Sequence, residues 1–322
     1  MINLNQLSLP ESFLDFDPEK YIVDPHLLEA AKLAIALNQP LLLTGEPGTG
    51  KTKMAFKLAD ILHKASTGGL NFAAEPLVFN TKTTSAARDL FYTYDAVSHF
   101  QEANIKKAET DKKAKTSDFI NLQALGLAIA KTNPAQLDKQ PALRGEIGDQ
   151  PTSNVVLIDE IDKAPRDFPN DILNEIEQYE FQIKELDNLL ITSKGNQRIV
   201  IVMTSNSEKN LPEAFLRRCV FYHIPFPDDK RLMEIAQKQL GEATPHTKEL
   251  LKDLIAHFRK IRKHSIRKKP ATAELIAWLR LLGLPEVIKM DDAKKADYLK
   301  ANLSILVKTR EDLEAVRAAF KL

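Results

Sequence analysis

Short apolar runs alternate with stretches of helical spacing over most of the chain. A short run without alternation is typical of a strand buried on both faces of a parallel sheet. Such runs predict strands at 40–44, 77–80, 155–158, 198–203 and 220–224. Apolar residues three or four apart predict helices at 25–38, 53–62, 122–129, 168–179 and 211–218. Strands that alternate with helices indicate an α/β fold, here with a central parallel five-stranded sheet.

The pattern changes after Pro225 and Pro227, which indicate a domain boundary. From Asp228 onward only helical spacing remains, with one apolar stripe over Leu250, Leu254, Phe258 and Ile261. The chain therefore divides into a large α/β domain and a smaller helical domain. We predict an N-terminal arm at 1–20, an α/β domain at 21–227 with an insertion around 82–150, and a helical domain at 228–322.

Two segments of the α/β part have their own patterns. The runs 181–183 and 189–191 predict a β-hairpin. The lysine-rich run 106–115 predicts a solvated helix or a loop, because charge runs are usually exposed to water.

A glycine-rich loop follows the first strand and leads into a helix. It consists of Gly45, Glu46, Pro47, Gly48, Thr49, Gly50, Lys51 and Thr52. Glycines in such a loop let successive backbone N–H groups turn toward phosphate oxygens, and the helix dipole adds to that field. The spacing of the glycines and the Lys51–Thr52 pair match a phosphate-binding loop in its expected context. We expect Lys51 to reach the outer phosphates of a nucleotide and Thr52 to bind magnesium.

An acidic pair, Asp159 and Glu160, follows the apolar run at 155–158. Ligands of open parallel sheets bind at the carboxyl ends of the strands, which is where this pair is expected. Asp159 is the candidate magnesium ligand, and Glu160 is the candidate base for the attacking water. Asn206 ends the next buried strand and could contact a γ-phosphate or that water.

Composition limits the classes of protein to consider. Lysine and arginine number 45 and aspartate and glutamate 44, so the net charge of +1 creates no global field that attracts nucleic acid. The single cysteine, Cys219, excludes an internal disulfide framework. Neither a secretory signal nor an apolar run long enough to cross a bilayer is evident. We therefore expect a cytoplasmic protein without a membrane span.

Several of these motifs, taken in order, resemble the AAA+ ATPases, and within them the MoxR group. The similarity covers about residues 20–283 and is most specific in the stretches GEPGTGKT, VVLIDEID and MTSNSEKNLPEAFLRRCVFYHIPFP. The resemblance implies an ATP- and Mg²⁺-dependent hydrolase with a helical lid. It assigns Asn206 as the first sensor, Arg218 as the arginine finger and Arg217 as its assistant.

The resemblance also implies partners. A finger that acts in trans requires a ring or spiral of copies of this chain, commonly a hexamer, in which one subunit completes the site of the next. MoxR-like ATPases commonly act with a protein that carries a von Willebrand factor A domain. We expect such a partner, and a role as a chaperone or remodeller of a protein client or in metal-cofactor insertion.

Two positions depart from the family pattern or extend it. The second-sensor arginine is missing from the start of the lid helix, where Lys269 is the candidate substitute for nucleotide binding. Lysine lacks the bidentate fork of arginine, so the exchange is not neutral. Asn80 ends the second strand, where related proteins restrain the catalytic glutamate with a polar residue.

Two other functional classes compete with the remodelling ATPase. A nucleic-acid motor or a restriction-type subunit could use seven basic residues between Arg259 and Lys269 to bind phosphates, but no aromatic side chains interleave with them. A nucleotide-gated scaffold would bind nucleotide with little turnover, and the intact Glu160 argues against it.

Overall fold

The computed structural model describes residues 16–109, 115–145, 147–207, 211–241, 247–283, 298 and 302–320. Its centre is a five-stranded parallel sheet in the order β2–β5–β8–β1–β9, which confirms the predicted α/β class. The strands are β1 (Leu41–Gly45), β2 (Leu77–Asn80), β5 (Asn154–Asp159), β8 (Ile199–Ser205) and β9 (Val220–Ile224). Parallel pairing places all their carboxyl ends at one edge.

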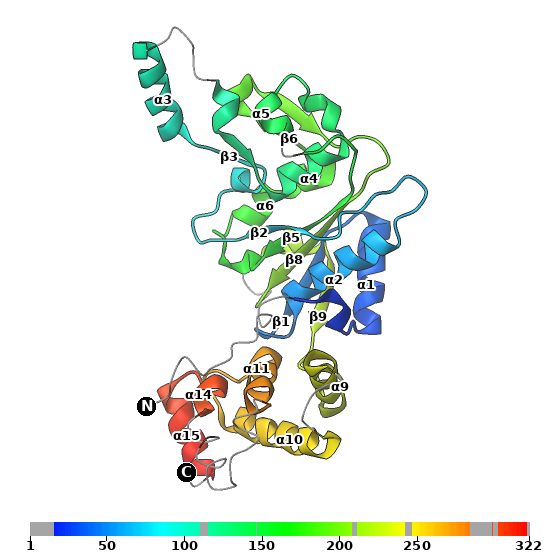
Figure 1. Ribbon diagram of the computed structural model, residues 1–322, viewed down its shortest axis with the longest axis vertical. Helices are drawn as coiled ribbons and strands as arrows, with labels where there is room; N and C mark the ends of the chain where they lie inside the picture. The colour runs from blue at the N-terminus through cyan, green and yellow to red at the C-terminus, as the bar shows by residue number, and fades with distance from the viewer. Residues whose placement is uncertain are drawn as a thin grey trace.

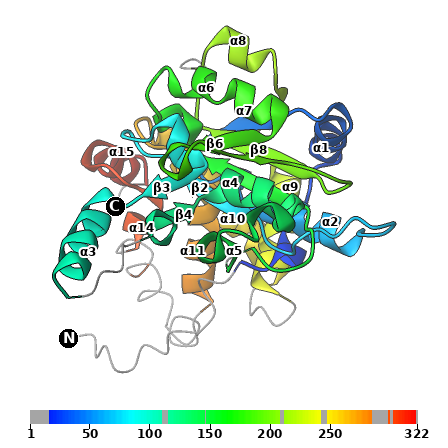
Figure 2. The same cartoon turned by 90° about the horizontal axis from the view of Figure 1, so that it is seen from above.

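Each central strand is buried on both faces because helices cover the sheet on two sides. Alternate residues enter different cores, as in β1, where Leu41 and Leu43 face one layer and Leu42 faces the other. The first layer contains α1 (Pro25–Leu37) and α2 (Lys51–Lys64). The second contains α4 (Ala124–Thr132), α6 (Phe168–Asp171), α7 (Leu173–Gln178) and α8 (Glu213–Leu216). Figures 1 and 2 show these helices around the sheet.

The strand β2 is only partly buried, unlike the prediction. It lies at the edge of the sheet, where Val78 is 40% exposed. An apolar run alone does not distinguish an edge strand from a central one, because the position in the sheet depends on pairing.

The predicted helix at 168–179 is two short helices instead of one. α6 ends at Asp171, α7 starts at Leu173, and Tyr179 adopts a left-handed conformation with φ of 49°. Phe168, Ile172 and Ile176 are all buried in the same core, as their spacing of four residues predicts. The predicted hairpin follows as β6 (Glu180–Ile183) and β7 (Leu189–Thr192), paired antiparallel.

The insertion between β2 and β5 is mostly folded. Its elements are η3 (Ala87–Leu90), β3 (Tyr92–Tyr94), α3 (Ala96–Glu109), η4 (Thr116–Phe119), β4 (Ile120–Leu122), α4, η5 (Pro134–Leu137) and α5 (Pro141–Arg144). Leu122, predicted as helical, ends β4 and pairs with Tyr92. α3 extends away from the sheet (Figure 1). The lysine run lies largely outside the described residues: 110–114 are not described, nor are the side chains of 105–109.

In the described residues after β9 the regular structure is helical, as the pattern predicts. They are α9 (Asp229–Leu240), α10 (Lys248–His264), α11 (Thr272–Leu282), α14 (Leu303–Leu306) and α15 (Arg310–Phe320). They surround a separate core that contains Phe258 and Trp278. The predicted stripe is partly wrong: Leu250 is 44% exposed, whereas Leu251 and Ile255 are buried. The boundary at residue 227 stays a prediction.

Of the predicted N-terminal arm, residues 1–15 lie outside the described part. The remainder forms η2 (Pro18–Lys20), and Phe16 packs edge-on against Phe56 of α2. None of the helices in the described ranges is both long and apolar enough to cross a membrane.

Candidate functional site

A cleft of about 1020 Å³ lies between the sheet and the helices that follow it. One wall is the loop after β1, with residues Pro47 to Thr52, joined by Asp159, Glu160 and Asn206 from the ends of β5 and β8. The opposite wall comes from α9 and α11, and Tyr21 and Ile22 close one end. The cleft therefore contains most of the side chains that the sequence predicts to act together. Gly45 and Glu46 begin the loop but do not line the cleft.

Two glycines give the loop its shape. Gly48 and Gly50 have φ values of 75° and 91°, in the region that residues other than glycine rarely adopt. The loop turns directly into α2, so the N-terminus of that helix faces the cleft. An L-residue at either position would strain the loop.

Lys51 is directed back over the loop that carries it. Its ammonium donates to the carbonyls of Gly45 (2.8 Å) and Glu46 (3.0 Å) and to Asn206 Oδ1 (3.0 Å). Burial lowers the pKa of Lys51, although Asp162, Asp159 and Glu160 oppose that shift, because burial disfavours a charge and nearby opposite charges favour it. A buried cation at this position is suited to bind an anion that enters the cleft.

Thr52, Asp159 and Thr204 form a row of oxygen atoms. Thr52 Oγ1 donates to Asp159 Oδ1 at 2.9 Å, and Thr204 Oγ1 donates to the same oxygen at 2.5 Å. Magnesium is commonly held by one or two protein oxygens together with the phosphates of its substrate. The hydroxyl of Thr52 and the carboxylate of Asp159, which lie next to each other at the end of the phosphate loop, could supply those protein oxygens. Within the described ranges, no cluster of three or more His, Cys, Asp or Glu side chains could hold a metal without such help.

Glu160 has an unusual backbone conformation. Its φ of 54° and ψ of 50° are left-handed. That conformation is uncommon for a residue other than glycine and often occurs at functional sites. The hydroxyl of Thr204 accepts the N–H of Glu160 at 2.8 Å and holds this turn in place. The carboxylate contacts Asn206 Nδ2 at 3.4 Å and forms an ion pair with Lys163.

Asn206 links the two halves of the site. Its amide oxygen accepts from Lys51, its amide nitrogen faces Glu160, and its backbone N–H donates to Asp162 Oδ1 at 3.2 Å. The Asn206 side chain thus contacts both the ammonium of Lys51 and the carboxylate of Glu160, which follows the neighbouring strand β5. This bridge places Asn206 between the expected positions of the phosphates and the water.

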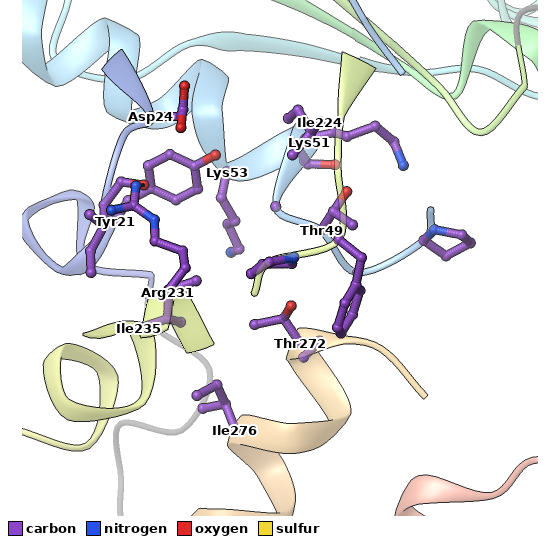
Figure 3. A pocket seen from close by; sticks show the side chains of 18 of the residues that line it. Tyr21, Asp24, Thr49, Lys51, Lys53, Ile224, Arg231, Ile235, Thr272 and Ile276 are labelled. Atoms are coloured by element: carbon purple, nitrogen blue, oxygen red, sulfur yellow. Dashed lines mark hydrogen bonds between the residues drawn. The ribbon is translucent and has the colours of Figure 1, made fainter. Parts of the chain in front are cut away.

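The other end of the cleft is lined by several apolar side chains. Figure 3 shows Tyr21, Ile235 and Ile276 around it, with Lys53 and Thr272 directed into the space between α2 and α11. Burial lowers the pKa of Lys53, whose ammonium lies 4.4 Å from the centre of the Phe16 ring. An apolar pocket beside a phosphate loop is suited to a nucleoside.

The paired arginines lie away from this cleft. Arg217 forms an ion pair with Glu213, and Arg218 Nε lies 2.6 Å from Glu177 Oε1. Neither lines the cleft of its own chain. Arg218 is about half exposed, so it is accessible to a second subunit. Their role in trans stays a prediction.

Lys269 and Asn80 do not make the contacts expected of them. Lys269 is exposed and does not line the cleft, which receives Thr272, Ala273 and Arg280 from α11 instead. Asn80 lies opposite Asp159 in the parallel pair β2–β5. Within the described part of the chain, its amide makes no hydrogen bond to Glu160.

Three cations of the basic stretch are engaged inside the chain. Arg259 pairs with Asp229, Arg262 with Glu46, and Arg267 with Glu311. These ion pairs reduce the positive charge that the stretch offers to a nucleic-acid backbone.

Some residues of the site were not predicted from the sequence. The sequence pattern predicts only a strand next to Thr204, and it includes Arg262 only within the basic stretch from Arg259 to Lys269. The polar run after a buried strand could have indicated Thr204, because a buried hydroxyl needs a partner. No local signal identifies Arg262, since its partner lies 216 residues away.

Comparison with known proteins supports one family. The profile of the family described as AAA domain (dynein-related subfamily) matches residues 40–219. No curated protein sequence matches significantly.

Solved structures resemble the chain more distantly. Domain III of the Thermotoga maritima replication initiation protein DnaA is 15% identical, with a TM-score of 0.44 over 92% of this chain and 98% of that one. The FIGL-1 AAA domain in complex with ADP is 16% identical, with a TM-score of 0.43 over 94% and 89%. A structure from work on katanin self-assembly is 17% identical, with a TM-score of 0.40 over 93% and 83%. At these TM-scores the likeness carries no argument about activity.

Proposed function

The chain belongs to the AAA domain family, dynein-related subfamily, and on that premise we propose that it hydrolyses ATP to ADP and phosphate with Mg²⁺. One observation carries this proposal. The cation of Lys51, the Thr52–Asp159 pair and Glu160 converge in a single cleft through Asn206 and Thr204. Few other activities require a phosphate loop and an acidic pair at the carboxyl ends of strands of one parallel sheet.

Each residue then has a role that follows from its position. Lys51 and the N–H groups of the loop bind the phosphates. Glu160 accepts a proton from the attacking water, and Asn206 orients that water or the γ-phosphate. When bound through Thr52 and Asp159, the magnesium ion neutralises charge on the phosphate oxygens. Glu160, at its left-handed turn, lines the cleft.

Residues 21–227 form the ATPase domain and 228–322 a lid over the nucleotide. Arg218, assisted by Arg217, reaches the nucleotide of a neighbouring copy in a ring or spiral, commonly of six. The half-exposed position of Arg218 outside its own cleft supports this role. The single cysteine supports a reducing, cytoplasmic location.

The finer assignment is to the MoxR group. It rests on the three long motifs in the sequence, and it implies a partner with a von Willebrand factor A domain and a protein client or metal-insertion task. A purified partner of that kind should bind the assembled ATPase and change its rate of turnover. An ATPase whose rate and assembly are unaffected by such partners argues against this assignment.

The central test is the ATPase rate per subunit as a function of protein concentration. A site completed in trans predicts low activity in dilute monomer and a steep rise at the concentration where oligomers form. Light scattering on the same samples locates that threshold. A rate per subunit that stays flat through the threshold contradicts the finger in trans, while an absence of turnover at every concentration contradicts the ATPase itself.

A further inference from the structure

Arg262 of α10 is a buried cation with three different partners. Its side chain is 10% exposed, and it forms an ion pair with the carboxylate of Glu46. It also donates to the carbonyl of Pro270 at 2.6 Å, and its guanidinium carbon lies 3.6 Å from the centre of the Phe226 ring. A buried charge is costly unless it is paired and hydrogen-bonded. The ion pair, the hydrogen bond and the ring contact together stabilise the guanidinium in this position.

The three partners belong to three different segments of the chain. Glu46 is in the phosphate loop, Phe226 lies between β9 and α9, and Pro270 precedes α11. Arg262 therefore connects the phosphate loop both to the segment that leads into the helical part and to the start of the helix that faces the cleft. Of the side chains in the described ranges, it is the one that forms an ion pair with the loop.

A second close approach supports the same connection. A Cβ atom added to Gly48 would lie 2.8 Å from the Cβ of Ala271, the residue after Pro270. The loop thus touches the start of α11 at Gly48 as well as α10 through Glu46. The phosphate loop and the helical part are in contact at two points around the same cleft.

The segment that carries Pro270 is itself fixed from the C-terminal side. The carboxylate of Asp312, 1% exposed, accepts the N–H groups of Ile266, Arg267 and Lys268 at 2.7 to 2.9 Å. The backbone that receives the hydrogen bond of Arg262 is therefore held by α15. This leaves the guanidinium little freedom to follow the loop if the loop moves.

We infer that Arg262 is a positioning residue, which acts through Glu46 to hold the phosphate loop against the helical lid and thereby sets the affinity for nucleotide. Neither Arg262 nor Glu46 lines the cleft, so the effect is transmitted through the loop. The carbonyl of Glu46 also accepts from Lys51 at 3.0 Å, which connects the ion pair directly to the cation that binds phosphate. The inference rests on the proposed nucleotide binding.

The test is a double-mutant cycle on the affinity for ADP, measured by calorimetry. We expect Arg262→Gln and Glu46→Gln each to weaken ADP binding about tenfold, and the double variant to be no more than about twofold weaker than either. Arg262→Lys should recover part of the loss, since it keeps the charge but not the fork. Arg310→Gln removes an exposed pair with Glu314 on α15 and should leave the affinity unchanged.

Hydrogen exchange in the nucleotide-free protein provides the second readout. Peptides that cover residues 45–52 should exchange faster in both single variants and at the wild-type rate in Arg310→Gln. Unchanged exchange, or additive losses of ADP affinity, overturns the inference. If Arg262→Gln does not fold, hydrogen exchange of residues 45–52 and 266–271 in Glu46→Gln tests the inference by itself. Faster exchange than in the wild type supports the inference, and unchanged exchange overturns it. A wild-type protein that does not bind ADP refutes the proposed function, whereas the exchange experiment still tests the connection.

Discussion

The ammonium of Lys51 lies 3.0 Å from the amide oxygen of Asn206, although 155 residues separate them in the sequence. Neighbouring parallel strands, β1 and β8, bring the two together at their carboxyl ends. The contact joins the phosphate loop to the residue proposed to sense the γ-phosphate.

Lys51→Ala should weaken the binding of ATP strongly. A hydrogen bond to a charged group contributes about 1.5–3 kcal/mol, so the loss corresponds to roughly a 10- to 150-fold weaker affinity. Calorimetric titration with ATP measures it. Lys57→Ala is the matched control, because Lys57 is on the same helix and pairs with Asp60 instead of lining the cleft. Equal affinities in the two variants would contradict the role of Lys51.

Glu160→Gln should bind ATP with near wild-type affinity and lose turnover. Removal of a general base typically costs about 10²–10⁴ in rate. Phosphate release measures turnover, and the nucleotide content of the purified variant measures binding. Turnover retained in Glu160→Gln would contradict the role of Glu160 as the base, whereas a wild-type rate as low as that of the variant would support the nucleotide-gated scaffold. Glu29→Gln, which removes an exposed pair with Lys32 on α1, serves as the control.

Thr204→Val should reduce both stability and turnover. Thr204 is 1% exposed, and its hydroxyl accepts the N–H of Glu160 and donates to Asp159. Leaving these buried groups unpaired should lower the free energy of unfolding by about 1–3 kcal/mol. Denaturant unfolding and phosphate release are the measurements. Thr204→Ser keeps the hydroxyl and should preserve turnover. A loss of turnover in Thr204→Ser as large as that in Thr204→Val would show that packing, and not the hydroxyl, causes the effect.

Arg218→Ala should reduce turnover by as much as about 10³-fold without loss of ATP binding, if the arginine acts as a finger. Complementation tests whether it acts in trans. Lys51→Ala and Arg218→Ala subunits are each inactive alone, but a mixed oligomer contains some sites with an intact loop and an intact finger. Activity should therefore return on mixing. A mixture that stays inactive while mixed oligomers form would contradict action in trans.

The stability of the helical part should fall in acid through Asp312. Burial alone would raise the pKa of this carboxyl, but the N–H groups of Arg267, Lys268 and Ile266 and the hydroxyl of Thr309 outweigh it and lower the pKa from 3.8 to about 2, since they bind the charged form. Because the folded-state pKa is below the unfolded one, the stabilisation is present above about pH 4 and is lost as the pH falls toward about 2.

Unfolding followed by circular dichroism between pH 2 and 7 measures this dependence. Asp312→Asn should be less stable than wild type at pH 7 by about 2–4 kcal/mol and should show a shallower loss in acid. Asp253→Asn, at an exposed position of α10, should follow the wild-type curve. Parallel curves for wild type and Asp312→Asn would show that the acid loss comes from other groups.

The sequence by itself determined the sheet, the phosphate loop and the acidic pair. These depend on local signals: buried apolar runs, glycines at positions with positive φ, and polar residues that end strands. The break at Ile172 and the half-exposed β2 were not readable, because both depend on how elements pack after they form. The role of Thr204 likewise depends on tertiary structure, because it requires β5 and β8 to lie side by side.

Only the tertiary structure decided where the basic residues of the helical part point. The run from Arg259 to Lys269 is uniform in charge, yet Arg262 is buried against Glu46 while Lys269 is exposed. The physical reason is that an ion pair depends on distance in space, and helical periodicity defines a face without defining its partner. The chain thus encodes its phosphate site locally, whereas the connection between that site and the helical part exists only in the fold.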